Sequence, residues 1–259
     1  MSTWNQQIEE IIKGNDVHNP VRSLLLRILI FLLAANILFS FDSSAYRLGE
    51  SIIVFGEYPV VEELGRGAFG SKGGRTEAEK DSLLIDYDRG TGYREKALLE
   101  ALHFMSANVY GYRFTYKPGS VLMKREEEFT IELRGELGQD SVNLIADGVY
   151  DTIYRVKLEF QLTPSTFKWL LAFTSNTLRL EEAEGTSDFY AGWKGRDTAY
   201  REALRNLVLI TAKKRFSSKP LILEGDILVK GNPEFSVGAG RYYCKLKGFV
   251  NIVKVITYD

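Results

Sequence analysis

TGYREKALLEALHFMSANVYGYRFTYKP, residues 91–118 of a chain of 259 residues, begins and ends with short motifs that return later in the sequence. Its opening Thr-x-Tyr-Arg-Glu recurs at residues 198–202, and its closing Phe-x-x-Lys-Pro recurs at residues 216–220. The tyrosines of the two opening motifs lie 107 positions apart, whereas the phenylalanines of the closing motifs lie 102 apart. We therefore expect one folding unit to be present twice, with a second helix 5 positions shorter than the first.

Both stretches place apolar residues at helical spacing. Intervals of three and four residues put such side chains on one face of a helix. The first set is Ala97, Leu98, Ala101, Leu102, Met105 and Val109, and the second is Ala203, Leu204, Leu207, Val208, Thr211 and Ala212. Each stretch therefore predicts a helix with one face packed against the rest of its unit.

Strand-like patterns accompany these helices. Apolar and polar residues alternate within 129–137, 154–162 and 221–229, which is typical of antiparallel strands with one wet face, and residues 242–258 have a long strand-like pattern. Apolar runs at 51–56 and 82–87 predict two further strands, and turns are expected at Asp147-Gly148 and at Gly231-Asn232-Pro233. We expect an α+β fold of two similar modules, each a helix packed on an antiparallel sheet.

The pattern divides the chain into four parts. Residues 1–45 are expected to be a signal peptide or membrane anchor, 46–163 the first module, 164–196 a linker and 197–259 the second module. The linker is rich in apolar residues, so we expect it to pack between the modules rather than to form a free tether. Its pattern does not distinguish helix from strand.

The N-terminal segment predicts export from a bacterial cytoplasm. Residues 28–41 form an apolar stretch of 14, the length of a signal-peptide core, and Ser43 and Ala45 provide the small side chains that signal peptidase prefers. Counted from Ser23, the stretch reaches 19 residues, so an uncleaved anchor with Arg27 at the cytoplasmic interface is the alternative. A buried core helix is the third reading, disfavoured because the stretch is apolar all round.

The charge balance excludes one class of partner. With 33 Lys and Arg against 34 Asp and Glu, no nucleic-acid partner is expected. The basic residues at 213–219 are interpreted as charge at the C-terminal end of the second helix, where it opposes the macrodipole. The single cysteine, Cys244, excludes an internal disulfide, and its strand-like surroundings predict a buried thiol.

A glycine-rich segment resembles two nucleotide-binding motifs without satisfying either. Residues 64–70, Leu-Gly-Arg-Gly-Ala-Phe-Gly, match the glycine loop of protein kinases, but Lys72 stands where that loop needs valine and the other kinase motifs do not follow. Ser71-Lys72 also inverts the order that a P-loop requires. Residues 65–74 are therefore interpreted as a surface loop.

Titratable side chains provide weak candidates for catalysis. Of the two histidines, His18 precedes the apolar segment and His103 is expected to be a neutral imidazole on the first helix. Two acids suffice for a glycosidase, and the candidate groups are Glu126-Glu127-Glu128, Glu181-Glu182 and the pair Asp140 and Asp147. We interpret these acids as solvated turns and strand edges. No catalytic, cofactor-binding or metal-ligating residue is therefore expected.

Four aromatic residues follow the first helix at strand spacing. Tyr110, Tyr112, Phe114 and Tyr116 alternate, so their side chains would point to one face. We interpret that face as core beneath the helix. If it were exposed, it would be a contact surface for a glycan or a protein.

The first module resembles a known envelope family. Its helix of the type Tyr-Arg-Glu-x-Ala-Leu-x-x-Ala-Leu, the following Val109-Tyr110-Gly111 and the strand at 154–158 look like the N-terminal module of flagellar assembly protein T and related surface-lipoprotein domains. The resemblance covers residues 90–163 and, more faintly, 197–258. It implies a structural part of an envelope or flagellar assembly, with no catalytic residues to carry over. The chain departs from that family by lacking a lipid-attachment cysteine and by containing the module twice.

These observations predict an exported, non-enzymatic structural or interaction protein of the bacterial periplasm or envelope, with protein partners. The alternative is a periplasmic carbohydrate-active enzyme or glycan-binding protein that uses paired carboxylates and exposed tyrosines. A third reading is an anchored sensor domain. Two carboxylates that converge in a cleft beside exposed aromatics would favour the glycan hypothesis.

Overall fold

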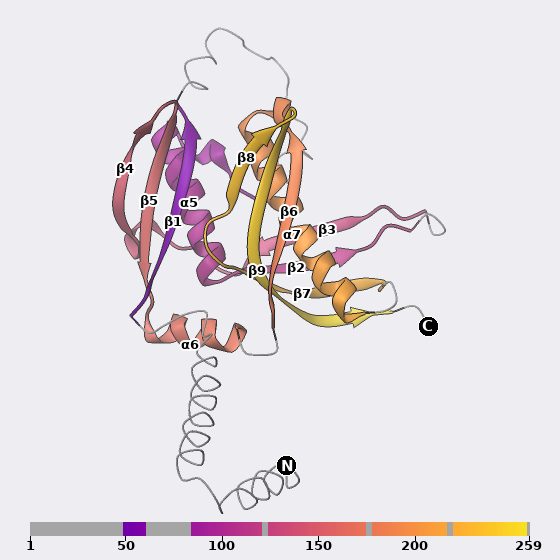
Figure 1. Ribbon diagram of the computed structural model, residues 1–259. Helices are drawn as coiled ribbons and strands as arrows, with labels where there is room; N and C mark the ends of the chain where they lie inside the picture. The colour runs from indigo at the N-terminus through magenta and orange to yellow at the C-terminus, as the bar shows by residue number, and fades with distance from the viewer. Residues whose placement is uncertain (1–48, 61–83, 121–123, 175–177, 217–219, 258–259) are drawn as a thin grey trace, which may run out of the picture. The chain divides into compact units, whose positions relative to one another are not determined.

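The computed structural model describes residues 49–60, 84–120, 124–174, 178–216 and 220–257 (Figure 1). The chain divides into two compact parts, Met1–Ala45 and Tyr46–Asp259, and the described residues all belong to the second. The expected signal peptide or anchor, His18 and the glycine-rich loop lie outside the described residues. Among the residues described, no helix has both the length and the apolar character needed to cross a membrane.

Two antiparallel sheets and three α-helices form the described part of the chain, which confirms the α+β class. The three-stranded sheet has the order β1-β5-β4, with β1 at Ser51–Pro59, β5 at Ile153–Gln161 and β4 at Asn143–Tyr150. Helix α5, Tyr93–Val109, packs on β1 and β5. The 3₁₀ helices are η1 at Tyr87–Arg89, η2 at Gln139–Ser141 and η3 at Phe189–Ala191.

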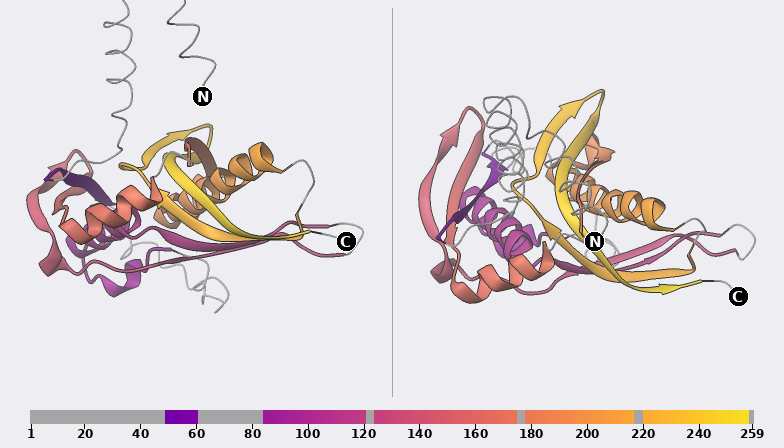
Figure 2. Two further views of the ribbon diagram at one scale, coloured as in Figure 1. Left: turned by 90° about the horizontal axis from the view of Figure 1, so that it is seen from below. Right: turned by 60° about the horizontal axis from the view of Figure 1, so that its bottom comes forward.

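The six-stranded sheet has the order β3-β2-β7-β9-β6, and β8 also pairs with β9. Its strands are β3 at Glu128–Leu133, β2 at Tyr112–Lys117, β7 at Ile222–Val229, β9 at Arg241–Ile256, β6 at Leu180–Asp188 and β8 at Glu234–Gly238. Helix α7, Trp193–Arg215, packs on β6 and β9 (Figure 2). The predicted long final strand is β9, whose first half pairs with β6 and β8 and whose second half pairs with β7.

Each long helix approaches its sheet at a glycine. A Cβ on Gly56 of β1 would lie 2.1 Å from the carbonyl oxygen of Ala97 and 2.4 Å from the amide nitrogen of Ala101. Gly185 of β6 has the same relation to α7, where a Cβ would lie 2.3 Å and 2.2 Å from the corresponding atoms of Ala199 and Ala203. Glycine in the strand and alanine in the helix thus permit backbone contact that larger side chains would prevent.

The expectation of a shorter second helix is wrong. Helix α7 has 23 residues and α5 has 17, because α7 begins at Trp193, five positions before the second Thr-x-Tyr-Arg-Glu motif. Gly192 precedes it with φ 67°, a conformation that glycine adopts without strain. The predicted basic residues Lys213, Lys214 and Arg215 do occupy the last turn of α7.

Two local predictions are also wrong. Residues 84–89 form an irregular segment and η1 rather than a strand, because the Leu84 amide donates to Asp197 of α7 at 2.8 Å instead of to a neighbouring strand. Asp147 and Gly148 lie inside β4, and the turn comes at Asp151, which has φ 55°. Asp147 does not turn the chain because its carboxylate accepts the Tyr154 hydroxyl across the β4–β5 pair.

The stretch expected to be a linker contains regular structure. Residues 164–196 include α6 at Pro164–Phe173, strand β6, η3 and the first residues of α7. Thr163 caps α6 by accepting the Thr166 amide through its hydroxyl, at 3.2 Å. The two expected modules also share one sheet, because β2 pairs with β7.

The aromatic face of β2 is core, as interpreted from the sequence. Tyr112, Phe114 and Tyr116 are buried and point to one side of the strand. Tyr110 is not on the strand, because it caps the C-terminus of α5, and its ring lies against Gly135.

Candidate functional site between α5 and β4

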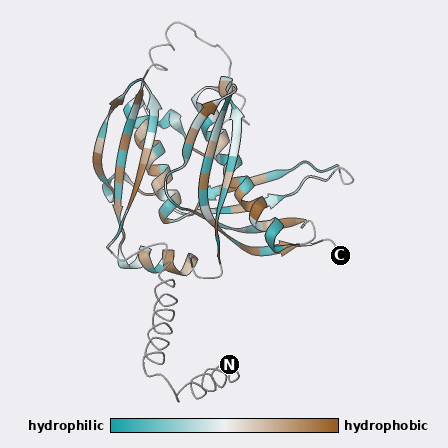
Figure 3. Ribbon diagram, in the orientation of Figure 1, coloured by the Kyte–Doolittle hydropathy of each residue, from teal (hydrophilic) through white to brown (hydrophobic). Residues whose placement is uncertain are grey.

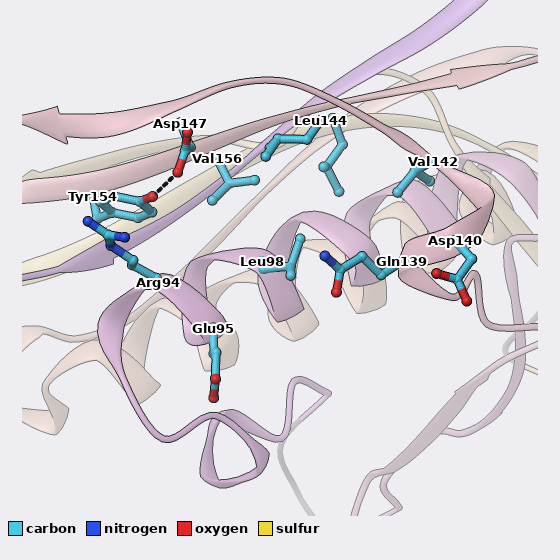
Figure 4. A pocket seen from close by; sticks show the side chains of 11 residues that line it. Arg94, Glu95, Leu98, Gln139, Asp140, Val142, Leu144, Asp147, Tyr154 and Val156 are labelled. Carbon is cyan, nitrogen blue, oxygen red and sulfur yellow. Dashed lines mark hydrogen bonds between the residues drawn. The ribbon is translucent and has the colours of Figure 1, made fainter.

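A cavity of about 320 Å³ lies between the N-terminal half of α5 and strands β4 and β5 (Figure 4). We call it the α5–β4 cleft. Its floor is apolar and its ends are polar. The side chains that matter for the argument are Arg94, Leu98, Val142, Leu144, Asp147 and Tyr154.

The local sequence explains why these side chains meet. Arg94 and Leu98 are four residues apart on α5 and therefore share a helix face. On β5, Tyr154 and Val156 point to the same side of the sheet, toward that helix. Strand β4 continues the wall beyond β5.

One end of the cleft is a polar cluster. The Tyr154 hydroxyl donates to the Asp147 carboxylate, and the Arg94 guanidinium lies 5.5 Å from the centroid of the Tyr154 ring. Burial and the neighbouring Asp147 carboxylate raise the pKa of Tyr154 above its ordinary value. Tyr154 therefore acts as a neutral donor that holds Asp147 in place.

Strand β4 is the outer edge of its sheet, because its described hydrogen-bonded neighbour is β5 alone. All but one of its residues are exposed, including the apolar Leu144, Ile145, Val149 and Tyr150. Figure 3 shows hydrophobic and hydrophilic residues along this strand. A bulge between Leu144 and Ala146 interrupts the register with β5. An exposed apolar edge strand is a ready template for pairing with another chain.

The structure separates most of the predicted acidic candidates. Glu127 accepts the Tyr116 hydroxyl at 2.7 Å, Glu128 pairs with Lys117 at 2.9 Å and Glu182 pairs with Lys245 at 2.8 Å. Glu126 is exposed, and Glu181 pairs with Lys214. Apart from Glu126, these acids therefore serve as partners for basic or phenolic groups on neighbouring elements.

Asp140 and Asp147 are the candidate acids that do share a cavity. Figure 4 shows them at opposite ends of the α5–β4 cleft, with the apolar side chains of Val142 and Leu144 between them. Glu95 also borders the cleft, but its carboxylate accepts the amide and hydroxyl of Thr91 at 2.7 and 2.8 Å. The acids thus lie around an apolar centre rather than facing each other.

A second polar cluster is buried where α5 and β1 meet α7. The Arg196 guanidinium donates to Glu57 of β1 at 2.9 Å and lies 3.3 Å from Glu100 of α5. It also lies 3.8 Å from the centroid of the Phe235 ring. Burial raises the pKa of Glu100 despite Arg196, whereas for Glu57 the attraction of Arg196 and Arg155 outweighs burial and lowers the pKa. We call this cluster the inner junction.

The predicted neutral histidine and buried thiol are confirmed. The Tyr112 hydroxyl lies 2.7 Å from His103 Nε2 and 3.0 Å from the Tyr200 hydroxyl. Burial lowers the pKa of His103 to about 3, so the imidazole is neutral at physiological pH. Cys244 is buried, and burial raises the pKa of its thiol, which disfavours the reactive thiolate.

Sequence reasoning missed both Arg94 and Arg196. A signal for them was present, because residues 94–102 read Arg-Glu-x-Ala-x-x-Glu-Ala-Leu and residues 196–204 read Arg-Asp-x-Ala-x-x-Glu-Ala-Leu. This match has an offset of 102, the same as that of Phe114 and Phe216. The Tyr-Arg-Glu motif is more conspicuous and has an offset of 107, so the alignment at an offset of 102 was overlooked.

The fold and the cleft define an α+β protein with an open sheet edge beside a largely apolar cleft. A model of an uncharacterised protein family matches residues 67–258, and the chain belongs to that family. An "Uncharacterized protein" of Treponema pallidum (strain Nichols) is 28% identical over 154 residues, which make up 58% of this chain and 64% of that relative. The chain thus covers less than two thirds of the relative's length. No solved structure matches the chain.

Proposed function

We propose that Tyr46–Asp259 is the interaction part of an exported, non-enzymatic protein of the bacterial periplasm or envelope, and that it binds a protein through β4 and the α5–β4 cleft. The observation that carries this proposal is the exposed apolar edge of β4. Binding of a protein there would bury Leu144 and Val149 and pair the free edge of the strand. An envelope or flagellar assembly is the setting that the sequence resemblance implies.

We further propose that this interaction part consists of two copies of one module. The first comprises β1, α5, β4 and β5, and the second comprises β6, α7, β8 and β9. Three correspondences support the proposal. The helices align at an offset of 102, the β4–β5 and β8–β9 hairpins align at an offset of 88, and Gly56 and Gly185 lie under equivalent alanines.

The hairpin correspondence includes the backbone. Val149 pairs with Tyr154 across one turn, and Val237 pairs with Tyr242 across the other. Asp151 and Ala239 occupy equivalent turn positions and have φ values of 55° and 49°. Non-glycine residues adopt positive φ rarely, so two such residues at the same offset support a common origin for the hairpins.

Glycan binding or hydrolysis is the second candidate, favoured by the presence of Asp140 and Asp147 on one cleft. Two features argue for the protein-binding hypothesis instead. Figure 4 shows the two acids at opposite ends of the cleft with apolar side chains between them, whereas the two acids of a glycosidase flank one glycosidic bond. The aromatic ring in the cleft belongs to Tyr154, which is buried and does not offer an open stacking face.

Site-specific photo-crosslinking in intact cells tests the proposal. A benzophenone amino acid is placed at Val149 of β4 and, as a matched control, at Val253 of β9, which is also exposed. We expect a discrete protein adduct from position 149 and none from position 253. Mass spectrometry of the mature N-terminus tests export, because a chain found in the cytoplasm with residues 1–45 intact contradicts it.

The glycan hypothesis makes the opposite prediction. Purified protein would bind or cleave envelope glycans, and Asp147→Asn would abolish that activity. Such a result, with no protein adduct at position 149, would overturn the protein-binding proposal.

A further inference from the structure

We propose that the partner of the α5–β4 cleft is a second chain of the same protein, which presents the surface formed by α7 and β6. The contact would repeat, between chains, the inner junction that already joins the two modules within one chain. This inference rests on the proposed duplication and names the partner of the proposed binding site.

The inner junction shows which surfaces of the two proposed modules contact each other. In Figure 1 the strands of the two sheets follow each other in the order β4, β5, β1 and then β8, β9, β6, and each helix packs on its own sheet. The edge of β1 therefore faces β8, and the Phe55 amide donates to the Asn232 side chain, which precedes β8, at 2.9 Å. The first module thus uses its β1 and α5 surface to cover the β8 and α7 surface of the second.

The covered surface centres on two residues of α7. Arg196 reaches Glu57 and Glu100 of the first module. The Tyr200 ring lies 5.1 Å from the Phe104 ring of α5, and Phe104 in turn lies 6.1 Å from Phe235 of β8. The second module's cleft is therefore filled by side chains of α5.

The equivalent surface of the first module is open. The offset of 102 relates Arg196 and Tyr200 to Arg94 and Leu98, both of which line the α5–β4 cleft. Arg94 is exposed, whereas Arg196 is buried. The exposed edge of β4 and the α5–β4 cleft therefore occupy the positions in the first module that the inner junction covers in the second.

The other end of the row offers the complementary surface. The same offset relates Glu100 to Glu202 of α7, which is half-buried and pairs with Arg205 of its own helix. Arg94 of one chain would therefore lie close to Glu202 of the next chain. This pair has the same charges as Arg196 and Glu100 in the inner junction. Asn206 takes the place of Phe104 and Asp147 that of Phe235, so this contact would be more polar than the inner junction.

The symmetry of such a contact determines the assembly. Two different surfaces meet, so one chain can bind a neighbour at each end, and growth stops only if the rotation closes a ring. Equal surfaces, as in a twofold dimer, would give a fixed mass instead. Mass that rises with concentration beyond two chains is therefore the expected signature.

Charge-reversal variants of the full-length purified protein test the contact by sedimentation velocity. Arg94→Glu and Glu202→Arg should each weaken self-association by roughly tenfold or more, because each places like charges in the contact. The double variant should restore it by reversing the pair. Lys168→Glu on the exposed face of α6 makes the same charge change as Arg94→Glu and should leave association unchanged.

Mixing the single variants provides a second test. Arg94→Glu keeps the native α7 surface, and Glu202→Arg keeps the native cleft. The two variants can therefore alternate in the mixture, joined in turn by the native pair and by the reversed pair. The mixture should associate at concentrations where each variant alone is monomeric. Circular dichroism of each variant shows that loss of association does not arise from unfolding.

The outcomes separate this inference from the proposed function. A mass of one chain at every concentration, together with a crosslink from position 149 to a different protein, would overturn self-association and leave the proposed function standing. Association that ignores both charge reversals would also overturn the inference. No association and no crosslink would refute both.

Discussion

Asp197 and Glu95 occupy equivalent positions in α7 and α5 but in opposite environments. Asp197 is buried beneath residues 84–85, and its burial raises the pKa of the carboxyl to about 7, despite the hydrogen bonds that it accepts from the Leu84 and Ile85 amides. Glu95 is exposed, and the hydrogen bonds from Thr91 lower its pKa. One acid therefore destabilises the folded state when it is ionised, and the other helps to begin its helix.

We predict that Asp197→Asn stabilises the protein increasingly as pH rises from about 4 to about 7. The folded-state pKa of Asp197 lies above its unfolded value of 3.8, so the folded chain binds more protons in this interval and the free energy of unfolding falls with rising pH. Removing the acid should recover up to about 4 kcal/mol above pH 7. Urea unfolding at pH 5, 6, 7 and 8 measures the difference.

The comparison must be made between variant and parent at each pH. His103 has a folded pKa of about 3, below its unfolded value of 6.5, so its contribution makes the free energy of unfolding rise with pH from 3 to 6.5 and opposes the Asp197 effect. Taking the difference removes the histidine contribution. Asp140→Asn controls for the loss of a negative charge, and an Asp197→Asn effect that does not change with pH would contradict the assignment.

The helices and strands owe their spacing to small residues. The contact of α5 with β1 depends on Gly56 lying below Ala97 and Ala101, and that of α7 with β6 depends on Gly185 in the same way. Neither glycine was singled out in the sequence, because glycine inside a strand pattern indicates close approach without saying to what. Which helix residues lie against each glycine is determined only when the helix packs on the sheet.

We predict that Gly56→Ala and Gly185→Ala each destabilise the protein by about 1 to 3 kcal/mol, because the added methyl group would lie within 2.4 Å of helix backbone atoms. Chemical denaturation measures the change. Gly138→Ala is the matched control, since a Cβ there meets nothing within 4 Å and its φ of −77° suits alanine, so its effect should stay within about 0.5 kcal/mol. If Gly56→Ala and Gly138→Ala changed the free energy of unfolding equally, helix α5 could move away from β1 to accommodate the methyl group. That result would contradict the prediction.

For Tyr46–Asp259 as a whole, the inner junction and the β2–β7 pair connect the two proposed modules. Arg196 contacts two carboxylates from the other module, and β2 hydrogen-bonds with β7 in the same sheet. Duplication alone would allow two independent domains. Here each module leaves part of its surface for the other to cover.

We predict a single thermal unfolding transition for this part of the chain, and a loss of about 3 to 5 kcal/mol in Arg196→Met, which would leave Glu100 buried without its cation. Adding Glu100→Gln should recover part of the loss, so the two substitutions would be far from additive. Differential scanning calorimetry and a double-mutant cycle measure both effects. Two separate transitions in the parent would contradict the coupling, as would additive energies.

Local patterns were sufficient for much of the secondary structure and of the core. The apolar stripes located α5 and most of α7, and the strand-like patterns located β3, β5, β7 and β9. Alternation of aromatic residues after the first helix also identified Tyr112 and Phe114 as core. These predictions succeeded because periodicity reports which face is buried, and that depends on neighbours close in sequence. The neutral state of His103 and the buried Cys244 followed from their placement on such elements.

Long-range contacts decided the rest. The stretch at 164–196 contains strand β6 because β6 pairs with β9, more than 50 residues away. Leu84 is not part of a strand because its amide donates to Asp197 of α7. The α5–β4 cleft and the inner junction likewise depend on which surfaces meet after the helices pack on their glycines. Periodicity could assign each residue to a face, but tertiary packing chose the partner of that face, because the partner's contacts exist only once the chain has folded.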